Sequence, residues 1–96
     1  MYVLTPEAAE DFERLLAESI LEWGTGTARK TRARLERQFE RIADGVAVGH
    51  VREDVPARLP LRFVIEPPFV IAFDRETRII IRILYGGQHF PQVFEG

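Results

Sequence analysis

The sequence predicts an α+β fold in which a helical hairpin packs on one face of an antiparallel sheet, in the order β-α-α-β-β-β. Two long segments with helical apolar spacing fill the first half of the chain. Runs rich in β-branched and aromatic residues fill the second half, and the links between them are too short for parallel crossovers. The 96 residues suit one domain, 1–96, with residues 87–96 as a C-terminal tail.

The chain begins with a short candidate strand at residues 2–4, followed at once by a helix start. Thr5 has the side chain of an N-cap, and Pro6 suits the first helical position. The helix is expected to end at Trp23, because Gly24 is a natural C-terminal stop. Its apolar stripe consists of Ala8, Ala9, Phe12, Leu15, Leu16, Ser19, Ile20 and Trp23.

A second helix is expected after a connection of about three residues, so the two helices should form an antiparallel hairpin. Either Thr25 or Thr27 can serve as its N-cap. Its stripe consists of Ala28, Thr31, Leu35, Phe39, Ile42 and Val46.

Three strands are expected after a loop over residues 45–58, which contains glycines, a proline and several charges. The strands should cover residues 59–65, 69–74 and 78–85. Short connections favour an antiparallel meander, and residues 2–4 should join the sheet at an edge.

Alternation along the strands predicts two unequal sheet faces. The heavier face should pack under the helices and consists of Leu61, Phe63, Ile65, Phe69, Ile71, Phe73, Ile79, Ile81, Ile83 and Tyr85. The lighter face consists of Arg62, Val64, Val70, Ala72, Ile80, Arg82 and Leu84. Only the tail after Gly87 remains to cover it, and an apolar face left open typically marks a partner site.

The strand at residues 78–85 carries an arginine, Arg82, in the middle of a β-branched run. A guanidinium cannot be buried unpaired at tolerable cost. The lighter face, which carries Arg82, is therefore not expected to be sealed inside the domain. Aliphatic side chains around an arginine indicate a docking surface.

Composition excludes several classes of protein. The chain has no cysteine, so it has neither a disulfide framework nor thiolate chemistry. It has no apolar stretch near the ~18 residues that span a bilayer and no signal-peptide pattern, which favours the cytoplasm. The net charge of −2 lacks the basic excess of a nucleic-acid binder. His50 and His89 lie far apart without companion ligands, so we expect no metal site and no cofactor.

Four segments in order resemble the ParE branch of the RelE/ParE toxin superfamily. They are the opening Tyr-Val-Leu-Thr-Pro-Glu-Ala-Ala-Glu-Asp-Phe, Glu22-Trp23-Gly24, Arg52-Glu53-Asp54 and Ile83-Leu84-Tyr85-Gly86. The resemblance covers nearly the whole chain. It implies a toxin of a bacterial type II toxin–antitoxin module, of the kind also described as plasmid stabilisation proteins, that is neutralised by a ParD-like antitoxin in a hetero-oligomer.

The resemblance leaves two targets open. ParE-type members poison DNA gyrase by binding, whereas RelE-type members cleave mRNA on the ribosome. Cleavage would need groups that activate the 2′-hydroxyl and stabilise phosphorane charge, and the matching candidates are Arg62, Arg82, Tyr85 and His89. The low net charge and the single lysine, Lys30, fit ribosome docking poorly. Gyrase inhibition is therefore the preferred reading, with the ribonuclease and a non-toxic antitoxin-binding remnant as alternatives.

Two candidate surfaces follow from the resemblance and the open face. The expected antitoxin contacts are Val64, Val70, Ala72, Ile80 and Leu84, or else the groove beside the helical hairpin. The expected target contacts are Arg82, Tyr85, Gln88, His89 and Phe90. Many relatives carry a basic pair after the last strand where this chain has Gly87 and Gln88, so any role of those charges is in doubt. The apolar tail is expected to contact the target or to dock on the open sheet face.

Overall fold

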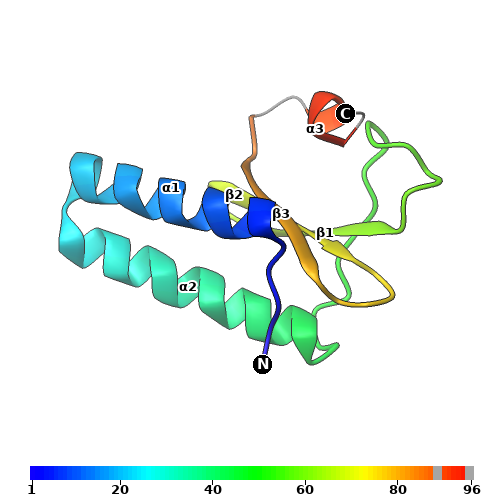
Figure 1. Ribbon diagram of the computed structural model, residues 1–96, viewed down its shortest axis with the longest axis horizontal. Helices are drawn as coiled ribbons and strands as arrows, with labels where there is room; N and C mark the ends of the chain where they lie inside the picture. The colour runs from blue at the N-terminus through cyan, green and yellow to red at the C-terminus, as the bar shows by residue number, and fades with distance from the viewer. Residues whose placement is uncertain (88–89, 95–96) are drawn as a thin grey trace.

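The computed structural model describes residues 1–87 and 90–94, and its two long helices and three strands follow the predicted order, with an unpredicted short helix in the tail (Figure 1). They are α1 (Pro6–Trp23), α2 (Thr25–Ala43), β1 (Leu61–Glu66), β2 (Phe69–Asp74), β3 (Ile80–Tyr85) and α3 (Phe90–Phe94). The strands form an antiparallel sheet in the order β1-β2-β3, which confirms the α+β fold class. Over the described residues, none of the helices is long and apolar enough to cross a membrane.

The helical hairpin forms because each of its helices has one apolar stripe and α1 has clear end signals. The Thr5 hydroxyl accepts a hydrogen bond from the N–H of Ala8 at 3.1 Å and so caps α1. Gly24 alone joins the helices, with a φ of 88° that favours glycine. Between the helices, Phe12 packs edge-on against Phe39 with ring centroids 5.2 Å apart. The predicted antiparallel hairpin is therefore confirmed (Figure 1).

The hairpin tip, where α1 meets α2, reaches past the sheet (Figure 1). The α1 stripe is buried only as far as Leu16, while Ile20 is 46% and Trp23 70% exposed. The end of the predicted apolar stripe, at Ile20 and Trp23, therefore lies outside the core. Val46 is also exposed, because α2 ends at Ala43 rather than continuing to residue 46.

The N-terminal segment joins the sheet at the outer edge of β3, as predicted. Leu4 forms a single parallel bridge with Ile80 rather than a regular strand. The Ile80 N–H donates to the Val3 carbonyl and the Thr5 N–H donates to the Ile80 carbonyl, both at 3.0 Å. These bonds place the start of α1 directly beside β3.

The sheet has a hydrophobic cluster on each face. The helix-side cluster comprises Ala8, Phe12, Leu15, Leu16, Leu35, Phe39, Ile42, Ala47, Phe69, Ile71, Phe73, Ile80 and Ile83. The cluster on the opposite face, called the second face below, comprises Val55, Leu61, Phe63, Val70, Ala72, Leu84 and Phe90.

The predicted face assignment is correct for β2 but wrong for much of β1 and for two residues of β3. Residues directly opposite each other in a sheet share a face. Phe63 lies opposite Ala72, which puts it on the second face, whereas Val64 lies opposite Ile71 and packs toward the helices. In β3 a register shift places Ile80 opposite Phe73, so Ile80 also turns toward the helices, whereas Ile81 packs against the second-face cluster.

The second face is covered, contrary to the expectation that it is open. Val55 from the loop after α2 and Phe90 from α3 both pack on it. Val70, Ala72 and Leu84 are consequently buried. The five residues expected to contact the antitoxin thus do not form one open surface, because two pack toward the helices and three lie under the tail. Docking of the tail on this face, one of its two predicted roles, is observed.

Candidate functional site

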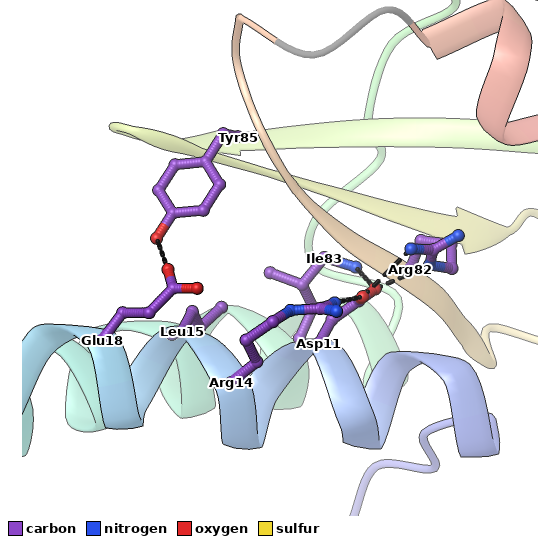
Figure 2. A pocket seen from close by; sticks show the side chains of 7 residues that line it. All are labelled: Asp11, Arg14, Leu15, Glu18, Arg82, Ile83 and Tyr85. Carbon is purple, nitrogen blue, oxygen red and sulfur yellow. Dashed lines mark hydrogen bonds and ion pairs between the residues drawn. The ribbon is translucent and has the colours of Figure 1, made fainter.

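A buried carboxylate on α1 holds the arginine of β3. Asp11 is 3% exposed, and its Oδ2 and Oδ1 accept hydrogen bonds from Arg82 Nε at 2.7 Å and Nη2 at 3.0 Å. Oδ2 also accepts the Ile83 backbone N–H at 3.0 Å, and Oδ1 accepts Arg14 Nη2 at 2.6 Å. Figure 2 shows these groups converging on one carboxylate. Asp11 therefore satisfies both a partly buried cation and a backbone donor on the outer edge of β3.

The positions of Asp11 and Arg82 follow from the elements that carry them. Asp11 lies between Ala8 and Leu15 on the buried side of α1. Arg82 lies opposite Ala72 on the second face of β3, and α1 runs along the free edge of that strand. A charge-assisted pair with two hydrogen bonds is among the stronger polar contacts in proteins. The hydrogen bond to Asp11 raises the pKa of Arg82, so its guanidinium stays charged.

The end of β3 makes a second polar contact with α1. The Tyr85 hydroxyl donates a hydrogen bond to Glu18 Oε2 at 2.9 Å (Figure 2). Partial burial, followed by this hydrogen bond, raises the pKa of the Tyr85 phenol above its ordinary value. The phenol is therefore protonated at neutral pH and is a hydrogen-bond donor rather than a base.

These contacts line a groove between α1 and the end of β3. A cavity of about 230 Å³ is lined by Asp11, Arg14, Leu15, Glu18, Arg82, Ile83 and Tyr85 (Figure 2). A neighbouring cavity of about 410 Å³ shares three of these residues, Leu15, Glu18 and Tyr85, and continues toward the hairpin tip. Its wall includes Trp23 and Phe69, with Glu22 as a further carboxylate. The combined surface, called the α1–β3 groove below, is partly apolar and carries both carboxylates and guanidinium groups.

The structure does not bring the two candidate arginines together. Arg62 lies opposite Phe73, which belongs to the helix-side cluster, whereas Arg82 lies opposite Ala72 on the second face. The two backbone positions are on different strands with β2 between them. Arg62 Nη1 donates to the carbonyl of its neighbour Leu61 at 3.1 Å.

The expected target contacts are also divided. Arg82 and Tyr85 line the same cavity. Gln88 and His89 lie outside the described residues. Phe90 is fully buried on the second face, where Arg52 lies over its ring with Cζ 3.8 Å from the centroid. Phe90 is therefore not part of the α1–β3 groove.

The chain resembles known proteins in both sequence and fold. One family model, described as the ParE toxin of the type II toxin-antitoxin system parDE, matches residues 2–90. The chain belongs to this family. It is therefore a ParE-type toxin of a type II toxin–antitoxin system, a class that implies an antitoxin partner.

The fold of the toxin is similar to a solved structure described as a chromosomal ParDE toxin–antitoxin system from P. aeruginosa. The match has a TM-score of 0.67 at 24% sequence identity, and it covers 88% of this chain and 96% of that chain. At this identity the likeness supports the fold alone. Among curated protein sequences, none matches the toxin significantly.

The toxin offers no evident place for a metal ion within residues 1–87 and 90–94. Over these residues, no three or more histidine, aspartate or glutamate side chains gather closely enough to bind one. The described part of the α1–β3 groove combines carboxylates, arginines that are already hydrogen-bonded and a protonated phenol. Such an arrangement can bind a partner through hydrogen bonds and apolar contacts.

Three residues of the toxin were not predicted to be important. Asp11 and Glu18 on α1 hold Arg82 and Tyr85, and Arg52 covers Phe90. A signal for Asp11 was present in the sequence, because it is an acid beside the apolar stripe of an amphipathic helix. A lone arginine in a β-branched strand needs such a partner, so the two could have been matched. Arg52 lies in one of the segments that carry the family resemblance, but the contacts of Glu18 and Arg52 depend on how distant segments meet.

The hydrogen bond between Tyr85 and Glu18 gives a test of small expected effect. Replacing Tyr85 with Phe is expected to lower the free energy of unfolding by about 0.5 kcal/mol at pH 7, because the bond is partly exposed to water. Since the folded pKa of the phenol is raised, this contribution is present below pH ~10 and is lost as the pH rises through the folded pKa. Urea unfolding at pH 7, with Glu22→Gln as the control, measures the difference. A variant as stable as the wild type at pH 7 would contradict it.

Proposed function

We propose that this toxin inhibits DNA gyrase by direct binding and that a ParD-like antitoxin neutralises it by covering part of its surface. Membership of the ParE family supports the proposal. These partners imply that the toxin acts in the bacterial cytoplasm. Binding rather than chemistry is the proposed mode of action.

One observation favours binding over catalysis: Arg82 is already hydrogen-bonded to Asp11 within the toxin. Its guanidinium donates two hydrogen bonds to Asp11, so it is not poised to stabilise charge on a reacting phosphate. Arg62 lies at a strand position on the other face of the sheet, opposite Phe73. Tyr85 is protonated and donates to Glu18. These two contacts and the separate position of Arg62 disfavour the RelE-like ribonuclease, which would need the same side chains for catalysis.

The α1–β3 groove and the hairpin tip are the surface that we assign to gyrase. The tip exposes Leu21 and Trp23, and Tyr85 lies further along the same groove. Exposed large apolar side chains beside polar groups are typical of protein interfaces, and tryptophan and tyrosine dominate many binding hot spots.

A direct binding measurement tests this assignment. Purified gyrase should bind immobilised toxin, and Trp23→Ala should weaken binding by at least about tenfold if Trp23 is a hot spot. Val48→Ala is the matched control, because Val48 is equally exposed but lies after α2 and outside the groove. Equal affinities for the wild type and Trp23→Ala would contradict the assignment. No binding by either protein would contradict the gyrase target itself.

A further inference from the structure

We propose that two copies of the toxin pair through the outer face of the helical hairpin, with α1 of each copy lying on α2 of the other. The outer face is the side of the two helices that is turned away from the sheet. Its exposed residues include Glu10, Glu13, Ile20, Arg29, Ala33 and Arg37. The inference involves neither gyrase nor an antitoxin, so it goes beyond the proposed function.

The two helices of the hairpin carry opposite charges. α1 contains six carboxylates and one arginine, whereas α2 contains six basic residues and two carboxylates. Within the part of the chain that the structure describes, no ion pair joins α1 to α2, and Glu13 and Arg37 take part in none. These exposed charges are therefore available to a second chain.

A hollow with an apolar base lies along the seam between the two helices. Its volume is about 260 Å³, and its lining comes entirely from α1 and α2: Leu16, Ile20, Thr25, Ala28, Arg29 and Arg32. Leu16 and Ala28 are buried at its base, while Ile20 is 46% exposed. Since none of these residues belongs to the sheet, the hollow opens on the outer face. An apolar side chain of a second copy can cover it.

Charge selects one of the two ways in which a two-fold axis can stack these faces. In an isologous pair, both copies contribute the same patch of surface. An axis running across the helices would place α1 on α1 and α2 on α2, so like charges would meet. An axis running along the helices places α1 on α2 of the second copy, so acids meet bases. This second arrangement also brings the two hollows, each with its Ile20, face to face.

The positions of the charges along the hairpin agree with this arrangement. Counted from Gly24 at 1.5 Å per residue, Glu13 and Glu10 lie about 17 and 21 Å from the tip, and Arg37 lies about 20 Å from it. An axis along the helices leaves these heights unchanged. Arg37 of each copy therefore meets Glu10 and Glu13 of the other. Ala33, one turn closer to the tip, is small enough to let the helices approach.

The outer face is large enough for a weak dimer. With its 18 residues α1 is about 27 Å long, and two helices packed about 8–10 Å apart make a face about 20 Å wide. Pairing would bury about 1,000 Å² in total, at the lower end of the range for specific interfaces. We expect a micromolar dissociation constant that rises with salt, because exposed charge pairs are screened. The α1–β3 groove lies on the side of α1 that faces β3, so it stays open.

Sedimentation equilibrium of the full-length toxin, from about 1 μM to about 1 mM, measures the pairing. At low salt the wild type is expected to convert from monomer to dimer over this range, and about 0.5 M NaCl should raise the dissociation constant at least about threefold. Glu13→Arg and Arg37→Glu each bring like charges together twice in a dimer, so each should raise it at least about tenfold. Glu76→Arg, the same change at an exposed position in the turn after β2, should match the wild type.

An equimolar mixture of Glu13→Arg and Arg37→Glu tests the arrangement of the helices. In a mixed dimer, the new charge at position 13 of one chain meets the new opposite charge at position 37 of the other. The second half of the interface keeps the native contact between Glu13 and Arg37. The mixture should therefore dimerise at least about tenfold more tightly than either variant alone. Such recovery would also show that both variants are folded.

Three results would overturn the proposal. A wild type that stays monomeric up to about 1 mM would exclude the dimer. A dimer that neither variant weakens would show that pairing uses another face of the toxin. Two weakened variants that do not recover when mixed would exclude the stacking of α1 on α2. Because gyrase and antitoxin are absent from these measurements, none of the three results bears on the proposed function.

Discussion

Replacing Asp11 with Ala is expected to lower the free energy of unfolding by about 3 kcal/mol, because removing one partner of a buried ion pair leaves the other uncompensated. Arg82 would lose two hydrogen bonds, and the Ile83 N–H would lose its bond to the carboxylate. The edge of β3 beside α1 would then carry an unpaired cation and an unpaired backbone donor. Each of these costs free energy, because the backbone donor is buried and the cation is partly buried.

Urea unfolding measures this change, and two further variants show its cause. Glu10→Ala removes an exposed carboxylate from the same helix and should stay within about 0.5 kcal/mol of the wild type. Asp11→Ala combined with Arg82→Met removes both charges and should recover at least about half of the loss. A single variant within about 1 kcal/mol of the wild type would contradict the role assigned to Asp11.

Gly49→Ala is also expected to destabilise the toxin strongly, by about 3 kcal/mol, because strain and overpacking act together. Gly49 has a φ of 76°, which a side chain rarely adopts. A Cβ at this position would lie 2.8 Å from Phe73 Cε1 and 3.0 Å from Arg62 Cβ. Phe73 is fully buried and cannot move aside easily. The adjacent His50 pairs with Phe63 through two backbone bonds of 2.9 Å, so the loop cannot shift freely either.

Gly45→Ala provides a matched control for Gly49→Ala. Gly45 has nearly the same φ, 77°, but an added Cβ would meet no atom within 4 Å. Gly45→Ala should therefore lower the free energy of unfolding by only about 1 kcal/mol, the cost of a side chain at a positive φ. The difference between the two variants in urea unfolding isolates the close approach to Phe73. Equal losses would mean that the close approach has no measurable cost.

The elements of the fold could be predicted from local signals, but the faces of the sheet could not. Thr5, Gly24 and the short strand connections each act within a few residues, and the hairpin and the meander follow from them. The register of β1 and the shift near Ile80 depend on contacts between strands. A one-residue change in register turns every side chain to the other face. Leu61 and Phe63 were misplaced for this reason.

The candidate site was predictable only in part. Arg82 and Tyr85 were both named as candidate target contacts from the sequence, and they line one cavity in the structure. Their partners on α1 lie 71 and 67 residues away in sequence, and only the packing of α1 against β3 brings them together. The sequence contained one indication of these partners, namely that a charged residue, Asp11, lies on the buried side of α1. It would have indicated that Arg82 has a structural partner.

Supercoiling by purified gyrase, with the toxin titrated in, most directly tests whether this ParE-type toxin acts on gyrase by binding. A translation-coupled mRNA cleavage assay with the same preparation should run beside it. We expect supercoiling to be lost, or cleaved DNA to be trapped, while the mRNA stays intact. Cleaved mRNA with normal supercoiling would contradict the proposal, because Arg82 would then have to leave Asp11 and act on a phosphate.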